Sequence, residues 1–213
     1  MPSKQIYQFT VELKHYKPRI WRRIQVSGDT QMSSFAYIMM ALFEMQGYHL
    51  FCFNVPVAEE KVSTISKENK FKKALLKADE MPYKIKELTL KVPAPEDIEA
   101  FNYGLNYDAR MIYIQDIFPK ISERAVFCYD FGDDWQFLIK LEKIIDIADL
   151  ANKEMPRVLK GKGYGIVEDC GGVYGLDNEL FDLTEFDLED MDDSVKGATE
   201  FFKEIYEEHL ENP

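Results

Sequence analysis

The sequence predicts an α+β fold: a mixed or antiparallel sheet with a strand-strand-helix-strand start, a central aromatic hairpin and a C-terminal helix. Apolar and polar side chains alternate over 6–13 and over 127–141, which is the period of half-buried strands. Apolar residues recur at helical spacing after Ser33 and after Ser194. With 213 residues, 46% hydrophobic and 14% aromatic, the chain can bury one core, so we expect a single domain over 1–213.

The start of the chain contains four expected elements. A strand over 6–13 is followed by a turn and by a second strand over 20–26. Serines at 33 and 34 are suitable N-caps, the apolar residues after them have helical spacing, and Gly47 closes the helix. A third strand is expected over 50–55.

Arg22 is anomalous because it shares the apolar face of the second strand with Ile20 and Ile24. A charge on an apolar face needs a partner, since burying it alone is costly. One interpretation is that the side chain extends to water at a sheet edge. The other is that it meets a carboxylate from elsewhere in the chain. On the second interpretation, we predict that Arg22 or Arg23 lies within salt-bridge reach of Asp130, Asp133, Glu168 or Asp169.

The middle of the chain is rich in lysine and glutamate over 58–91, which is typical of a solvated surface. A short helix is expected around 71–78 and a short strand over 88–92. Residues 112–117 fit either a strand or a short helix.

The hairpin over 127–141 is the clearest unit in the sequence. Its two arms are rich in aromatic residues, and Gly132-Asp133-Asp134 forms the turn. Cross-strand aromatic pairs would hold its register. Trp135 begins the second arm, where it fits either the core or the lining of a binding cleft.

The last third begins with a basic, glycine-rich stretch over 156–165, which we expect to be a loop. The acidic segment 177–193 follows; it contains nine acids and no base, and is a candidate docking surface for a basic partner. A final helix is expected over 194–210.

Composition excludes several classes of protein. No apolar stretch is long enough to span a membrane, and three cysteines without C-x-x-C spacing favour a reducing compartment, so we expect a cytoplasmic protein. The net charge of −12 disfavours direct binding of nucleic acid, although residues 1–55 contain six Lys or Arg and three acids, which leaves room for a local basic face.

Catalytic signatures are missing from the sequence: it has no G-x-S-x-G, H-E-x-x-H or Walker motif. The remaining candidates for chemistry are clustered carboxylates, because hard divalent ions prefer oxygen ligands. The candidate metal ligands are Asp130, Asp133, Glu168 and Asp169. An aspartate in a tight turn also hydrogen-bonds its own backbone, so a structural role is the competing interpretation. Further candidates for binding a ligand are Arg22, Arg23, His49, Asp134, Trp135 and Cys170.

Five motifs in this order resemble the plasmid pRiA4b ORF-3-like family over about 5–176. They are Tyr7-Gln-Phe-Thr-Val-Glu-Leu13, Pro18-Arg-Ile-Trp-Arg-Arg-Ile24, His49-Leu-Phe51, Tyr129-Asp-Phe-Gly-Asp-Asp-Trp135 and Glu168-Asp-Cys-Gly-Gly172. The resemblance implies a compact α+β domain, found in bacteria and archaea and on mobile elements, and implies no particular reaction. Many relatives have a second cysteine five residues before the equivalent of Cys170, where this chain has Gly165, so no two-cysteine site is expected.

Two functional hypotheses follow. The first is a non-enzymatic binding or interaction module without a required cofactor, which takes a protein partner or a small ligand. The second is a metal-assisted hydrolase or related enzyme that uses the carboxylates of the D-F-G-D-D-W and E-D-C-G-G loops.

Overall fold

The protein is built on one eight-stranded sheet in the order β5-β4-β3-β6-β7-β1-β2-β8. The computed structural model describes residues 5–56, 87–91, 105–150, 153–177 and 183–211. The paired strands are antiparallel apart from β4 and β5, which are parallel. The strands are β1 (Gln5–Leu13), β2 (Trp21–Ser27), β3 (Phe51–Pro56), β4 (Glu87–Lys91), β5 (Leu105–Asp108), β6 (Arg124–Tyr129), β7 (Trp135–Asp146) and β8 (Arg157–Lys162).

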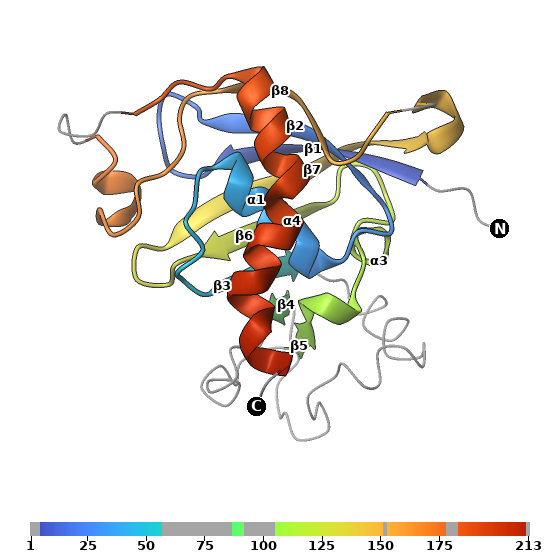
Figure 1. Cartoon of the computed structure of the whole chain (residues 1–213), viewed down its shortest axis with the longest axis horizontal. Helices are drawn as coiled ribbons and strands as arrows, with labels where there is room; N and C mark the ends of the chain where they lie inside the picture. The colour runs from blue at the N-terminus through green and yellow to red at the C-terminus, as the bar shows by residue number, and fades with distance from the viewer. Residues whose placement is uncertain (1–4, 57–86, 92–104, 151–152, 178–182, 212–213) are drawn as a thin grey trace.

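The helices α1 and α4 pack on the same face of this sheet, with α4 crossing in front of α1 (Figure 1). The rings of Tyr37 on α1 and Tyr206 on α4 stack at 5.7 Å between centroids. The helical segments are α1 (Met32–Leu42), α3 (Ile114–Ile117) and α4 (Leu188–Glu211), with short 3-10 turns at Ala109–Met111, Ile147–Leu150 and Gly172–Tyr174. No helix among the residues described has the length and hydropathy needed to cross a membrane.

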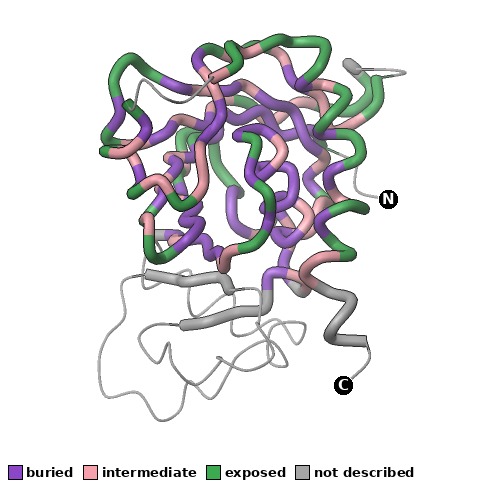
Figure 2. Tube along the Cα trace, turned by 60° about the vertical axis from the view of Figure 1, so that its left-hand side comes forward, coloured by how far each residue is buried: buried purple, intermediate pink, exposed green. Residues whose placement is uncertain are grey.

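The core lies between the sheet and α1, and we call the sheet face that lines it the inner face. Alternate strand residues point into it, as expected for period-two segments. Phe53 and Phe127 pack at 5.1 Å between ring centroids, and Phe9 contacts Phe35 at 5.2 Å. Figure 2 shows buried residues concentrated within the body of the protein and exposed ones along its outer turns.

The strand-strand-helix-strand start is confirmed by β1, β2, α1 and β3. The aromatic hairpin is confirmed as β6 and β7, whose register pairs Phe127 with Phe137 and Tyr129 with Trp135. The strand predicted over 88–92 is present as β4, and residues 114–117 form the helix α3. The helix expected around 71–78 lies outside the described residues.

Three boundaries differ from the prediction. The helix α1 begins at Met32 with Gln31 as its N-cap, so the predicted capping serines lie inside its first turn, where Ser33 is buried. It ends at Leu42, before the predicted closing residue Gly47. The predicted glycine-rich loop is largely strand β8, whose backbone pairs with β2 despite its glycine. The helix α4 begins at Leu188, because the carboxylate of Asp187 caps it by accepting from the amides of residues 189 and 190 at 2.8 and 3.1 Å.

Candidate functional site

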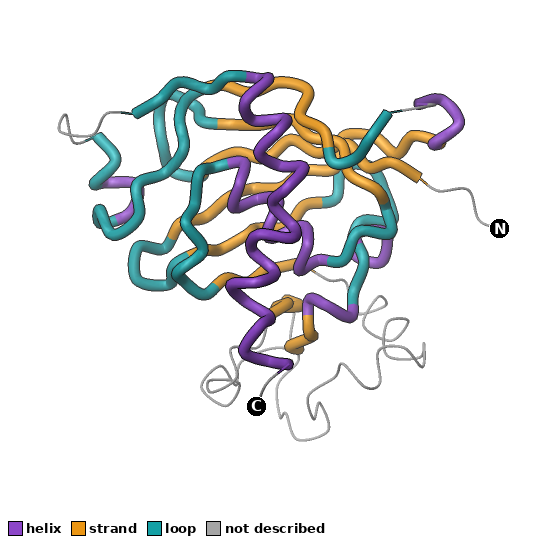
Figure 3. The backbone as a smooth tube through the Cα atoms, in the orientation of Figure 1, coloured by secondary structure: helices purple, strands orange, loops and turns teal. Residues whose placement is uncertain are grey.

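Three loops meet at one end of the sheet: the α1–β3 loop, the β6–β7 turn and the loop after β8 (Figure 3). Hydrogen bonds from backbone amides fix them to one another. The amide of Ile166 donates to the carbonyl of Phe43 at 2.9 Å, and the amide of Gly171 donates to the Asp133 carboxylate at 3.1 Å. The loops therefore bring together residues that are far apart in the sequence.

His49 lies at the centre of this junction. Its Nε2 is 3.6 Å from an oxygen of Asp130, 3.7 Å from one of Glu168 and 3.5 Å from one of Asp169. The side chains of Asp130 and Glu168 are 9% and 5% exposed, whereas those of His49 and Asp169 are 26% and 80% exposed. We call these four residues the His49 cluster; it has a buried wall and one open side.

Glu168 is held by donors on both sides. Its Oε1 accepts from the Tyr129 hydroxyl at 2.6 Å and from the amide of Gln46 at 2.7 Å. The Tyr129 hydroxyl in turn accepts from the amide of Gly47 at 3.1 Å. Burial and the neighbouring Glu168 carboxylate raise the pKa of Tyr129, so this hydroxyl stays protonated and remains a donor. The other carboxylate oxygen of Glu168 is left to face His49.

Asp130 serves the turn and the cluster with different oxygens. Its backbone has φ of +52°, a left-handed conformation, and its Oδ1 accepts from the amides of Gly132 and Asp133 at 2.9 and 3.3 Å. Its Oδ2 faces His49. The sequence left two interpretations open for this carboxylate, and the structure accommodates both.

The neighbouring turn aspartates point elsewhere. The carboxylate of Asp133 ties the β6–β7 turn to Gly171, and that of Asp134 accepts from the side-chain amide of Gln136 at 2.8 and 2.9 Å. The two loops are in close contact at Gly172, because a Cβ added there would lie 2.3 Å from the Asp133 carbonyl oxygen. Asp133 therefore joins the loops and is separate from the candidate ligands around His49.

Trp135 is not part of a surface. Its side chain is 0% exposed and packs in the core, and its indole Nε1 has no hydrogen-bond partner among the residues that the structure describes. Of the two interpretations of Trp135, a place in the core is confirmed and a place lining a cleft was wrong, because the period-two pattern of β7 turns this residue inward together with Phe137.

The predicted partners of the two arginines were also wrong. Arg22 is 0% exposed and lies between the rings of Phe43 and Phe186, at 5.2 and 4.7 Å from their centroids. It donates to backbone carbonyls, those of Trp21, Leu42, Lys162, Gly163 and Tyr164. Burial lowers its pKa to about 10. Arg23 lies on the opposite face and pairs with Glu142 at 2.8 and 2.9 Å.

Cys52, Cys128 and Cys170 form no disulfide within the described part of the chain. Burial, reinforced by the Asp133 charge, raises the pKa of Cys170, which disfavours the nucleophilic thiolate. Cys52 and Cys128 are register partners on β3 and β6, a proximity that their sequence separation concealed. The hydrogen bond from Cys52 lowers the pKa of Cys128.

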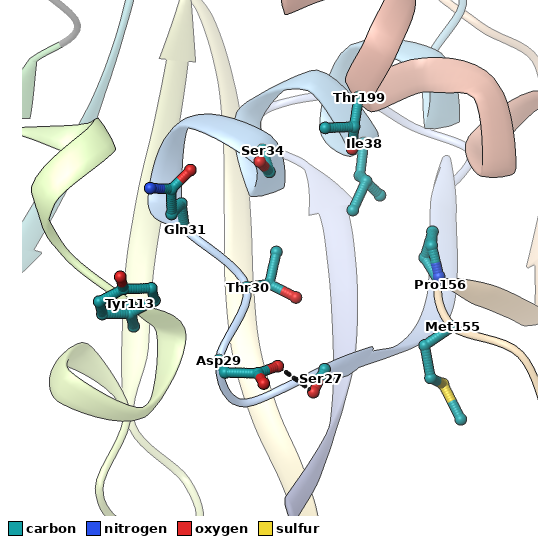
Figure 4. A pocket seen from close by; sticks show the side chains of 10 residues that line it. All are labelled: Ser27, Asp29, Thr30, Gln31, Ser34, Ile38, Tyr113, Met155, Pro156 and Thr199. Carbon is teal, nitrogen blue, oxygen red and sulfur yellow. Dashed lines mark hydrogen bonds between the residues drawn. The ribbon is translucent and has the colours of Figure 1, made fainter. Parts of the chain in front are cut away.

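A separate groove of about 460 Å³ lies beside the start of α1 (Figure 4). Its lining is mainly neutral and polar: Ser27, Asp29, Thr30, Gln31, Ser34, Ile38, Tyr113, Met155, Pro156 and Thr199. A hydrogen bond between Ser27 and Asp29 occupies the groove's carboxylate. The groove therefore offers fewer charged or metal-binding groups than the His49 cluster.

The His49 cluster offers one imidazole nitrogen and several carboxylate oxygens. Ligand atoms of His49, Asp130 and Asp169 all lie within 4.8 Å of one another. Mixed nitrogen and oxygen ligands of this type suit divalent ions such as Zn²⁺ and Mn²⁺. The sequence had named all four members as candidates, whereas it missed the supporting roles of Tyr129 and of the Gln46 amide.

Comparison with known proteins places these motifs in a family. A crystal structure of a protein of unknown function, MM3350 from Methanosarcina mazei Go1, shares the fold with a TM-score of 0.63 and 22% identity, covering 88% of this chain and 97% of that one. No curated protein matches. The family model for plasmid pRiA4b ORF-3-like proteins matches residues 5–209, so the match extends beyond the predicted limit of 176 and includes the acidic segment and most of α4. The chain therefore belongs to the plasmid pRiA4b ORF-3-like family.

Proposed function

We propose that this chain is a non-enzymatic binding module and that the His49 cluster binds a divalent metal ion. The observation that carries the proposal is the approach of three carboxylates from two separate loops to the same imidazole nitrogen, at 3.5 to 3.7 Å. Clustered carboxylates repel one another unless a cation separates them. A bound cation would remove that repulsion.

The distances from the imidazole are compatible with zinc, and His49, Asp130 and Asp169 are the residues whose ligand atoms all lie within 4.8 Å of one another. Zinc with bonds of about 2.0–2.1 Å in tetrahedral geometry separates its ligand atoms by roughly 3.4 Å. The distances from His49 Nε2 to the three carboxylates are 3.5 to 3.7 Å, close to that edge. The hydrogen bonds that Glu168 receives from Tyr129 and Gln46 would orient a ligand in the way that outer partners do in metal sites.

The test is a titration of chelator-treated protein with Zn²⁺ and with Mn²⁺, followed by calorimetry and by thermal unfolding. We expect one equivalent of metal to bind and to raise Tm, because a ligand that binds only the folded state stabilises it. His49→Ala and Asp130→Asn should weaken binding by at least tenfold.

Asp134→Asn is the matched control, because Asp134 lies in the same turn but bonds Gln136. It should bind metal as the unaltered protein does. The proposal fails if chelator-treated protein binds neither ion, or if the control and the cluster variants lose affinity equally.

A metal-assisted hydrolase is the second candidate. It is favoured by the open side of the cluster, where Asp169 is 80% exposed, because catalytic metal sites keep a position for water or substrate. We would test metal-loaded protein for hydrolysis of simple phosphodiesters and carboxyl esters. Turnover that requires both the metal and His49 would favour the enzyme, and binding without turnover would favour the module.

A further inference from the structure

The face of the sheet opposite the core has a charge unlike that of the chain as a whole. We call it the outer face; it is turned away from α1 and α4 in Figure 1. Its basic residues are Lys14, Arg19, Arg23, Arg124, Lys140, Lys143, Arg157, Lys160 and Lys162. Glu12 and Glu142 are acidic residues of the same face, and each pairs with an arginine. Basic residues therefore dominate this surface, although the net charge of the chain is −12.

Strand register aligns part of this charge in a row. Lys160 of β8 lies opposite Arg23, and Arg23 lies opposite Thr10 of β1. Thr10 in turn lies opposite Lys140, and Lys140 lies opposite Arg124 of β6. Since neighbouring strands are about 4.8 Å apart, the row spans roughly 19 Å across five strands.

The row is costly to the isolated protein. Arg124 and Lys140 are like charges placed directly opposite each other, an arrangement that destabilises a sheet. Glu142 compensates Arg23, whereas Lys140, Lys160 and Arg124 are exposed, and no carboxylate pairs with them within the described part of the chain. A row of uncompensated cations on a solvent-facing sheet fits a ligand that brings its own row of anions.

An aromatic side chain lies next to the row. The half-buried Trp21 lies opposite Lys162, and the guanidinium carbons of Arg19 and Arg23 are 5.8 and 5.6 Å from its ring centroid. Planar guanidinium and indole groups on an open sheet can stack unpaired bases, while the lysines contact phosphates. A flat sheet does not enter a duplex groove as a helix or a narrow ribbon does.

We infer that the outer face binds single-stranded nucleic acid along the basic row, with Trp21 contacting a base. The net charge of −12 does not describe this face, where Glu12 and Glu142 stand against nine basic residues. The inference is independent of the metal site, since none of the residues of the His49 cluster takes part.

The experiment measures fluorescence anisotropy of labelled 20-nucleotide poly(dT) and poly(rU), with a blunt 20-base-pair duplex, heparin and phosphatidylserine vesicles as competitors. EDTA is present throughout, so failure of the metal proposal leaves the outcome unaffected. The outer-face variant combines Arg124→Gln, Lys140→Gln and Lys160→Gln. Its matched control combines Lys120→Gln, Lys153→Gln and Lys203→Gln, which removes the same charge from exposed positions elsewhere.

We expect the outer-face variant to lose about tenfold or more in affinity and to flatten the salt dependence, with the control nearly unchanged. Binding should quench Trp21 and leave the buried Trp135 unaffected, so Trp21→Phe should abolish the quench. The inference is overturned if neither oligonucleotide binds at low salt, if both triple variants lose affinity equally, or if the duplex, heparin or the vesicles compete better than unlabelled single strands.

Discussion

Arg22 and Arg23 are neighbours in the chain, yet they lie on opposite faces of the sheet in different surroundings. Arg22 is buried on the inner face and donates only to backbone carbonyls among the hydrogen bonds described. Arg23 is partly exposed on the outer face and forms a two-point pair with Glu142, at 2.8 and 2.9 Å. The hydrogen bonds of the buried cation therefore go to backbone carbonyls, with Glu44 and Glu185 acting on it only as nearby charges, whereas those of the outer cation go to a carboxylate.

The difference shows how the fold accommodates a cation in its core by hydrogen bonds to backbone carbonyls, while the charges of Glu44 and Glu185 also favour its charged form. Leu42 supplies one acceptor at the C-terminal end of α1, where the helix dipole favours positive charge. The other carbonyls come from β2 and from the end of β8 and the loop that follows it. Arg22 thus satisfies carbonyls from three elements, and Phe186 covers it from the segment before α4.

The largest expected difference in stability between the two faces comes from removing the buried cation. Arg22→Leu should lower the free energy of unfolding by about 3–5 kcal/mol, because it leaves several buried carbonyls without a donor. Arg23→Leu, the matched control on the outer face, should cost about 1 kcal/mol, as exposed pairs do. Urea unfolding followed by tryptophan fluorescence measures both. Equal losses would mean that the two faces do not differ in this way.

Sequence patterns predicted this division in part. Period two placed Arg22 on an apolar face and showed that it needed a partner, and both statements are confirmed. The partner was wrong because carbonyls at the ends of distant elements carry no signature in a sequence. The prediction of a loop over 156–165 was wrong for a related reason. Pairing with β2 outweighs the poor strand propensity of glycine in β8.

The candidate site was predictable to a similar extent. His49, Asp130, Glu168 and Asp169 were named because they occur in motifs, and the loops bring them together. Tyr129 was treated only as a strand residue, since nothing in its alternation shows that its hydroxyl reaches Glu168. Contacts within a strand or a helix follow from periodicity, whereas contacts between loops require the fold.

A smaller difference in stability between the inner and outer faces is expected from substitutions on β8. Gly161 lies opposite Arg22, and a Cβ there would lie 2.7 Å from Arg22 Cδ and 2.8 Å from a ring carbon of Phe186. Gly161→Ala should therefore cost about 1–3 kcal/mol by overpacking. Lys160→Ala, one residue away on the outer face, should change stability by less than about 0.5 kcal/mol. Thermal unfolding of both variants checks this, and an unchanged Tm in Gly161→Ala would contradict tight packing around Arg22.

The smallest effect is a pH dependence on the outer face. Burial opposes ionisation of Glu142, but hydrogen bonds from Arg23, Thr10 and Gln8 outweigh it and hold its pKa at about 2. Because this value lies below the unfolded value of about 4.3, ionised Glu142 stabilises the fold above pH 4.3, and the contribution is lost as pH falls toward 2.

Glu142→Gln should therefore cost about 1 kcal/mol at pH 7 and progressively less on acidification, with the two unfolding curves converging near pH 2. Urea unfolding of both proteins between pH 7 and pH 2 measures the difference. A deficit in Glu142→Gln that stays constant over this range would show that the Glu142 charge does not stabilise the outer face. In that case the ion pair between Arg23 and Glu142 would not stabilise the fold. Arg23 would then be as available to an anionic ligand as Lys140 is.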